Sequence, residues 1–159
     1  MKKIFITILT ICFIASFAKA QDLNQYKKEN FVVGNDTLPY RILYPENFDE
    51  AKKYPVVLFL HGRGESGSDN EKQLNNGAKL FLTENFRKEF PAIVIFPQCA
   101  QNSYWANVDI ETVGGKRFFT FQKGGKPTKA MSLALSFTDE FFKNSFVDQS
   151  KIYVGGLSM

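Results

Sequence analysis

The chain has 159 residues, of which 44% are hydrophobic, 15% aromatic and 23% charged, so it can form one domain of modest size and is too apolar to be disordered. Its formal net charge is +4, but residues 1–20 hold three of the 20 basic residues and no acidic one, which leaves 17 basic against 16 acidic residues, a net charge of +1. No run of Lys or Arg exceeds two residues, so we expect no nucleic-acid partner.

Residues 1–20 have the three-part pattern of a secretory signal peptide. Two lysines precede an uncharged, mostly apolar run over residues 4–18, and the small residues Ala18 and Ala20 fit the two positions that signal peptidase recognises. The alternative, a membrane anchor, needs about 20 apolar residues, and this run is shorter. We therefore expect cleavage before Gln21, export to the periplasm or the extracellular space, and no stable membrane span.

Cysteine and histidine are scarce. Cys12 lies within the signal, so the mature chain keeps Cys99 alone, which cannot form an internal disulfide and is expected to be a small buried side chain at the end of a strand. There is one histidine, His61, and no spacing of residues typical of a metal site. We expect no metal and no cofactor.

The first half of the mature chain predicts three strands and a helix. Residues 31–33 and 38–44 are short strand-like segments separated by a turn signal. Residues 56–60 are apolar without alternation, which indicates a strand buried on both faces of a sheet. Residues 68–71 have the spacing of a capping box and predict a helix to about residue 82.

The second half continues the alternation. Residues 92–96 and 152–154 predict two further buried strands. Between them, apolar side chains from Ala130 to Phe142, Leu135 included, predict a helix packed on a sheet, with Thr128 as its N-cap. The long segment 98–126 contains two Gly-Gly pairs and predicts a small hairpin within a crossover, and loops of this length are often functional. Together these elements predict an α/β domain with a parallel sheet.

The last predicted strand runs into Gly156-Leu157-Ser158-Met159. A strand followed by Gly-x-Ser is the beginning of a nucleophile elbow, in which a sharp turn projects the Ser hydroxyl clear of the sheet. Gly156 supplies the small residue needed two positions before the serine. The motif is common, and an ordinary loop serine is the alternative.

A second motif, His61-Gly62-Arg63-Gly64, directly follows the strand at residues 56–60. Glycines in such a turn free backbone N–H groups, which can bind the oxyanion of a tetrahedral intermediate. A plain Gly-rich turn is the alternative. Both motifs stand at the carboxyl ends of strands, in the order that acyl-transfer chemistry requires, and together they favour a serine hydrolase.

With these motifs, the sequence resembles the α/β-hydrolase superfamily, and more narrowly its secreted bacterial branch of carboxylesterase-like, phospholipase-like and peptidase-like proteins. The stretches that carry the resemblance are residues 54–65, 69–74, 96–99 with Tyr104 and Trp105, and 152–159.

The resemblance implies a Ser-His-Asp mechanism on carboxylic esters. Ser158 would be the nucleophile, and the backbone N–H groups of Arg63 and Met159 would form the oxyanion hole. The residues expected to support these two turns are His61, Gly62, Gly64 and Gly156. Tyr104 and Trp105 would bind substrate near the mouth of the site, or else only pack within their loop.

The triad acid and base are missing. In this superfamily both follow the nucleophile, and nothing follows Met159 here. In the family, the histidine at the position of His61 packs under the oxyanion loop and takes no proton. We therefore expect residues 21–159 to be the N-terminal part of an α/β-hydrolase domain, a polypeptide that is poorly soluble and inactive when made alone.

Three functions remain open. The first is an exported serine esterase that acts on a small-molecule or glycan-linked ester. The second is a serine peptidase of the same fold. The third is a non-catalytic secreted carbohydrate-binding domain that uses its loop aromatics to stack sugars.

Overall fold

The computed structural model describes residues 22–158, so the predicted signal peptide and the backbone of Met159 lie outside the described residues. Within them the strands are β1 (Lys27–Val33), β2 (Asp36–Leu43), β3 (Tyr54–Leu60), β4 (Ile93–Pro97), β5 (Val108–Val113), β6 (Lys116–Phe121) and β7 (Val147–Gly156). The helices are α1 (Glu84–Glu89) and α2 (Lys129–Phe141), with short 3-10 helices η1 (Leu23–Gln25), η2 (Arg63–Glu65), η3 (Lys72–Leu74) and η4 (Ala78–Leu82).

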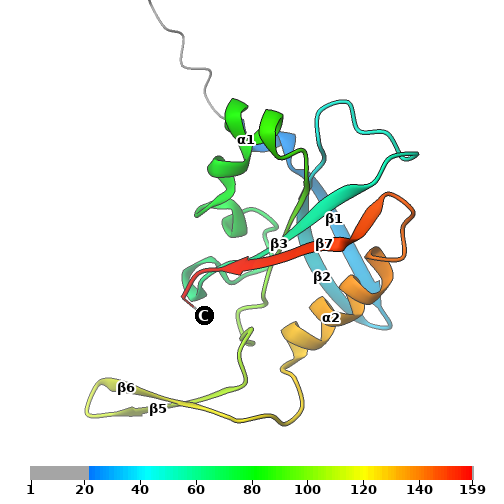
Figure 1. Cartoon of the computed structure of the whole chain (residues 1–159). Helices are drawn as coiled ribbons and strands as arrows, with labels where there is room; N and C mark the ends of the chain where they lie inside the picture. The colour runs from blue at the N-terminus through cyan, green and yellow to red at the C-terminus, as the bar shows by residue number, and fades with distance from the viewer. Residues whose placement is uncertain (1–21, 159) are drawn as a thin grey trace, which may run out of the picture.

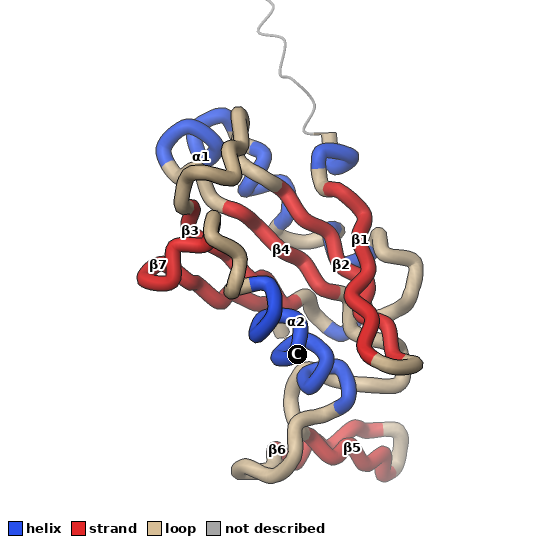
Figure 2. Tube along the Cα trace, turned by 90° about the vertical axis from the view of Figure 1, so that its right-hand side faces the viewer, coloured by secondary structure: helices blue, strands red, loops and turns tan. Residues whose placement is uncertain are grey.

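Five of these strands form one mixed sheet in the order β1-β2-β4-β3-β7 (Figure 1, Figure 2). Strands β4, β3 and β7 run parallel, whereas β1 and β2 are joined by a tight turn and pair antiparallel with their neighbours. The predicted α/β class is confirmed, with the parallel part of the sheet carrying the two candidate motifs. Because β3 and β7 are adjacent and parallel, their carboxyl ends meet at one edge of the sheet.

Strands β3 and β4 are largely buried on both faces, as their continuous apolar runs predict. The burial predicted for residues 152–154 is wrong, because β7 is the outermost strand of the described sheet and Tyr153 and Val154 are 56% and 69% exposed. Ile93 and Ile95 of β4 point into the core cluster that contains Phe137 of α2. Val94 and Phe96, which alternate with them, point into the opposite cluster, which contains Phe81 of η4. The two layers therefore hold β3 and β4 in place, and with them the loops that follow their carboxyl ends.

Helix α2 begins as predicted. The Thr128 hydroxyl oxygen accepts a hydrogen bond from the Met131 N–H at 3.2 Å, which satisfies one of the free donors of the first turn. Ala130, Ala134 and Phe137 pack on the sheet. The expectation that Leu135 joins this face is wrong, because its side chain is 47% exposed.

The helix predicted over residues 68–82 is wrong and is replaced by η3 and η4. The Asp69 carboxylate accepts hydrogen bonds from the N–H groups of Glu71 and Lys72, at 2.9 and 3.0 Å, and caps only a short turn. Gly77 then has φ +83°, outside the helical region. A Cβ there would lie 2.9 Å from the ring of Phe59, so the packing of β3 fixes glycine and ends any continuous helix.

The predicted hairpin is confirmed. Strands β5 and β6 form a separate two-stranded antiparallel sheet that extends away from the main sheet, below the end of β7 in Figure 1. Its turn uses Gly114 and Gly115, both with positive φ. Among the described helices, none has the length and apolar character that a bilayer crossing requires.

Candidate active site

The end of β7 turns sharply at Ser158. This residue has φ +64°, a left-handed conformation that is uncommon for any residue other than glycine and that is typical of strained functional turns. The turn is held to β3 by a hydrogen bond from the Leu157 N–H to the Leu60 carbonyl at 3.0 Å. A Cβ on Gly156 would lie 3.1 Å from the same carbonyl oxygen, so glycine is needed for β7 to approach β3 this closely.

The turn after β3 lies directly against this elbow. A Cβ on Gly62 would be 3.4 Å from the Ser158 Cβ and 3.4 Å from the Leu157 carbonyl oxygen. Arg63 opens η2, and the N–H at that position of a helix has no acceptor within the helix. The structure thus brings together Ser158, Gly62 and Arg63. Around Gly64, by contrast, a Cβ would meet nothing within 4 Å, so no close contact demands glycine there.

His61 is buried under the turn, where both ring nitrogens are engaged. Nδ1 lies 2.7 Å from the Gly62 carbonyl oxygen, and Nε2 accepts a hydrogen bond from the Cys99 N–H at 2.9 Å, an arrangement satisfied when the ring hydrogen is on Nδ1. Burial lowers the pKa of His61, which favours the neutral ring. The ring therefore joins the β3 turn to the β4 loop and has no free nitrogen for Ser158.

Trp105, predicted to bind substrate or else to pack within its loop, lies beneath the turn and does not line the cavity at Ser158. Its side chain is only 3% exposed, and its indole N–H donates to the His61 carbonyl oxygen at 3.1 Å. Its ring contacts the His61 ring edge to face, with 5.4 Å between centroids. These contacts favour the packing alternative for Trp105. Cys99 is also buried, as expected, and burial raises its pKa to about 11, which keeps the thiol protonated.

The Arg63 side chain has a role that the sequence did not reveal. Its guanidinium donates to the carbonyl oxygen of Ser103 at 2.7 Å and to that of Gln101. It also stacks on the Tyr104 ring, 4.2 Å from the centroid. Arg63 therefore fastens the loop after β4 to the turn after β3, and this places Tyr104 beside the elbow.

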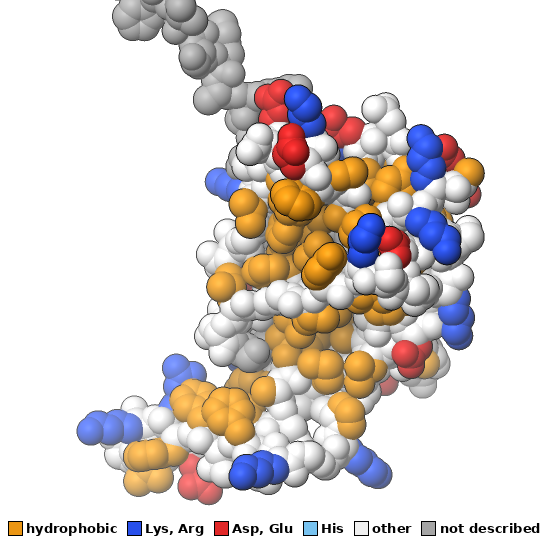
Figure 3. Space-filling model, in the orientation of Figure 1, with side chains coloured by type: hydrophobic (Ala, Val, Ile, Leu, Met, Phe, Trp, Pro, Cys, Tyr) orange, Lys and Arg blue, Asp and Glu red, His pale blue; other side chains and the backbone are white. Residues whose placement is uncertain are grey.

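Ser158, Arg63 and Tyr104 line one cavity of about 400 Å³. Its remaining walls come from Ala106 and from the hairpin, through Val108, Ile110, Arg117, Phe119 and Phe121. Figure 3 shows hydrophobic side chains gathered over the hairpin at the lower left, with Lys and Arg side chains near its far end. Sequence reasoning missed these hairpin residues, although the alternation of apolar side chains in β5 was a usable signal.

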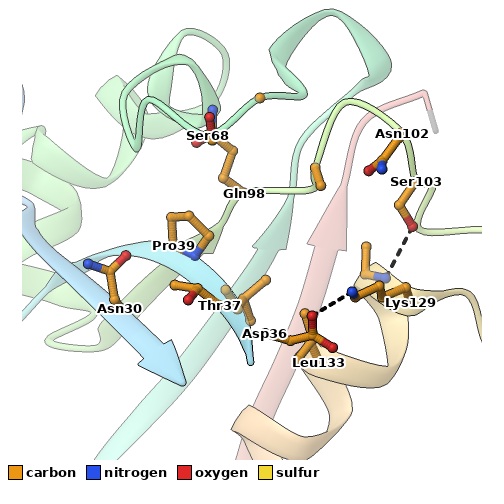
Figure 4. A pocket seen from close by; sticks show the side chains of 14 residues that line it. Asn30, Asp36, Thr37, Pro39, Ser68, Gln98, Asn102, Ser103, Lys129 and Leu133 are labelled. Atoms are coloured by element: carbon orange, nitrogen blue, oxygen red, sulfur yellow. Dashed lines mark hydrogen bonds and ion pairs between the residues drawn. The ribbon is translucent and has the colours of Figure 1, made fainter. Parts of the chain in front are cut away.

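A second cavity, of about 410 Å³, lies between the β1–β2 hairpin, the loop after β4 and the start of α2 (Figure 4). It shares no lining residue with the cavity at Ser158. Lys129 pairs with Asp36 at 2.5 Å, and the Ser103 hydroxyl accepts from the Ala130 N–H at 3.1 Å. These polar groups bind one another and join α2 to the sheet. Within residues 22–158, no three His, Cys, Asp or Glu side chains are grouped to hold a metal ion.

No family model matches the chain. Among solved structures it is similar to a thermostable esterase, with 28% identity and a TM-score of 0.69 over 84% of this chain and 34% of the esterase. A ferulic acid esterase from Anaeromyces mucronatus has 18% identity and a TM-score of 0.49, over 84% of this chain and 48% of that one.

Curated proteins match over short segments. A protein of Aspergillus terreus described as "Probable dipeptidyl-peptidase 5" is 38% identical over 45 residues, which are 28% of this chain and 6% of that protein. The dipeptidyl-peptidase 5 of Aspergillus fumigatus is 62% identical over 21 residues, 13% of this chain and 3% of that protein.

The order of the strands, the turn at Ser158 and the likeness to the thermostable esterase agree on one class. The chain has the α/β-hydrolase fold, as the sequence resemblance implied. It spans about a third of the length of the esterase and a small part of the dipeptidyl-peptidases that it matches.

Proposed function

We propose that the whole protein is a serine hydrolase of carboxylic esters with Ser158 as its nucleophile. One observation carries the proposal: Ser158 stands at φ +64° at the end of β7, against the Gly62 turn at the end of β3, and lines the same cavity as Arg63. The likeness to a thermostable esterase supports the ester substrate.

In the proposed reaction the Ser158 hydroxyl oxygen attacks the ester carbonyl carbon. The carbonyl electron pair moves onto oxygen, where the N–H groups of Arg63 and Met159 stabilise the negative charge, and one such donor contributes about 3 kcal/mol to the transition state. The hydroxyl proton passes to a base and then to the departing alcohol, which leaves an acyl ester on Ser158. Water releases the acid in a second, equivalent step.

The base is not His61, because both of its ring nitrogens are engaged. Residues 22–158 contain no other histidine. The proposal therefore assigns the base and its acidic partner to residues of the whole protein beyond those described. It also includes export, supported by the signal-peptide pattern of residues 1–20.

A peptidase of the same fold is the second candidate, favoured by the short matches to dipeptidyl-peptidase 5. It would use the same nucleophile and the same oxyanion donors. The carbohydrate-binding alternative gives the strained turn at Ser158 no role, and the burial of Trp105 removes one of the two aromatic rings that it required.

The test is covalent labelling of the full-length protein with a fluorophosphonate probe. Ser158→Ala should abolish labelling, whereas Ser150→Ala, a change to an exposed serine on the same strand, should leave it intact. Turnover of p-nitrophenyl acetate against that of a dipeptidyl p-nitroanilide then separates esterase from peptidase. Labelling that survives in Ser158→Ala would overturn the proposal.

A further inference from the structure

The β5–β6 hairpin has two different faces. In its antiparallel register, Val108 pairs with Phe121 and Ile110 pairs with Phe119. These four side chains lie on one face, because side chains alternate along a strand. All four line the cavity that holds Ser158. The opposite face, which carries Glu111 paired with Phe118, does not line it.

The cavity-facing row ends in a cation. Arg117 follows Phe119 on the same face and lines the same cavity, with its guanidinium 6.0 Å from the Phe119 ring centroid. The lining contains Arg63 and Arg117 and no acidic side chain. The Arg63 guanidinium already donates to two carbonyl groups. No ion pair within the described chain involves Arg117.

We propose that this hairpin face is the substrate-binding arm of the site and selects esters that have an extended apolar or aromatic part with an anionic end. The apolar part lies along Phe121, Phe119 and Ile110, and the anion pairs with Arg117. This inference rests on the proposed function of Ser158 and names the substrate class of that site.

The cavity-facing row of β6 is long compared with a short acyl group. From Phe121 to Arg117 is four residues along β6, or about 14 Å at about 3.4 Å per residue. A short acyl group such as acetyl cannot span this row, whereas a chain with a terminal carboxylate can reach toward its charged end. The unpaired cation and the absence of acidic side chains in the lining select an anion over a second cation.

The hairpin offers matched control variants, because neighbouring residues of the same type lie on its opposite faces. Phe118 and Phe119 are consecutive, chemically identical and equally exposed, at 54% and 52%, but they lie on opposite faces. Lys116 and Arg117 are likewise consecutive cations on opposite faces. Because all four side chains are on the surface, their replacement leaves the core unchanged, and thermal melting of each variant verifies the fold.

The experiment compares kcat/KM of the full-length protein on three p-nitrophenyl esters: acetate, octanoate and the mono ester of suberate, which is the octanoate chain with a terminal carboxylate. Phe119→Ala should lower the ratio of kcat/KM for octanoate to kcat/KM for acetate about tenfold, because burial of an aromatic side chain against a chain of this size is lost. Phe118→Ala should leave that ratio unchanged. Arg117→Gln should lower the preference for suberate over octanoate about fivefold, whereas Lys116→Gln should leave that preference unchanged.

The same comparison is made on the alcohol side with 4-butylphenyl acetate and the acetate of 4-(4-hydroxyphenyl)butanoate, which carries a terminal carboxylate. If Phe119→Ala and Arg117→Gln change kcat/KM in the p-nitrophenyl ester series alone, the arm binds the acyl part of the substrate. If they change it in the aryl acetate series alone, the arm binds the alcohol part. Equal effects of Phe118→Ala and Phe119→Ala, or of the two cation variants, in both series would overturn the arm.

Fluorophosphonate labelling separates this failure from failure of the proposed function. The probe reports the reactivity of Ser158 without an extended substrate. If the wild-type protein is labelled at Ser158 but the hairpin variants do not change kcat/KM, the proposed function is supported and the proposed binding arm is wrong. If the wild-type protein is not labelled at Ser158, the proposed function itself is wrong.

Discussion

The ring of His61 joins the turn after β3 to the loop after β4, through Gly62 and Cys99. We expect His61→Phe to lower the free energy of unfolding by about 1–3 kcal/mol at pH 7.5, because the buried Cys99 N–H loses its acceptor. Urea unfolding of the full-length protein measures the change. Trp105→Phe, which removes the hydrogen bond to the His61 carbonyl and part of a buried ring, should cost about 1–3 kcal/mol.

The difference in free energy of unfolding between wild type and His61→Phe should also depend on pH. Burial lowers the pKa of His61 below its ordinary 6.5, so the unfolded chain binds more protons than the folded protein just below pH 6.5. Stability from His61 is therefore complete above pH 6.5 and decreases as the pH falls, by at most about 1.4 kcal/mol per pH unit. The gap between wild type and His61→Phe should narrow from pH 7.5 to 5.5. A constant gap would show that the ring is not held neutral.

Substitution by alanine should have different effects at Gly156 and Gly64, although both glycines lie in turns of the candidate site. Gly156→Ala places a methyl group 3.1 Å from the Leu60 carbonyl oxygen, against backbone that cannot rotate away. We expect it to cost about 1–3 kcal/mol of stability and to slow fluorophosphonate labelling, because the elbow shifts relative to β3. Gly64→Ala, with open space around it, should leave both unchanged. Equal behaviour of the two variants would contradict this account.

The conformation of a single residue was predictable where the signal is local. The Gly-x-Ser motif after an apolar strand pointed to Ser158, and the strained φ of that residue is the conformation that such a motif requires. The roles of Trp105 and of the Arg63 guanidinium depend on partners about forty positions away, separated by 44 and 40 residues. Nothing in their immediate neighbourhood distinguishes an aromatic ring that binds substrate from one that packs beneath a turn.

At the scale of elements, the first turn of α2 is coupled to the candidate site. The Thr128 hydroxyl accepts from the Met131 N–H and donates to the Tyr104 carbonyl oxygen, so one side chain caps the helix and fixes the loop that lines the cavity. We expect Thr128→Val to lower stability by about 1 kcal/mol. Thr128→Ser, which keeps the hydroxyl, should remain close to wild type in thermal melting. A Val variant as stable as the Ser variant would exclude the cap.

A helix or strand was predictable where its own residues determine its structure, and not where a distant contact does. The apolar runs of β3 and β4 can be buried only between two layers, and the structure buries them so. The helix predicted over residues 68–82 was wrong because the ring of Phe59 requires glycine at position 77, and this is a tertiary contact that the local sequence does not show. The hairpin was predictable from its glycine pairs, but its position beside Ser158 depends on the paths of the loops after β4 and β6.

At the scale of the whole molecule, β7 leads directly into the turn with the candidate nucleophile and also forms one edge of the sheet in the described residues. Within residues 22–158 it is the last strand, and Tyr153 and Val154 are 56% and 69% exposed. A strand edge with apolar side chains is a template for pairing with a second chain. The placement that gives Ser158 its turn thus leaves, in these residues, a surface suited to self-association.

The polypeptide of residues 21–159, made alone, should therefore associate and fail to turn over p-nitrophenyl acetate. Val154→Lys should raise the monomer fraction in size-exclusion chromatography, because a charged side chain on an exposed edge opposes pairing. Lys151→Ala, which removes a charge from the same strand, should lower it. Turnover should stay absent in every variant, since the ring nitrogens of His61 are engaged. A soluble monomer that hydrolyses the ester and loses turnover in Ser158→Ala would show that these residues assemble a base by themselves.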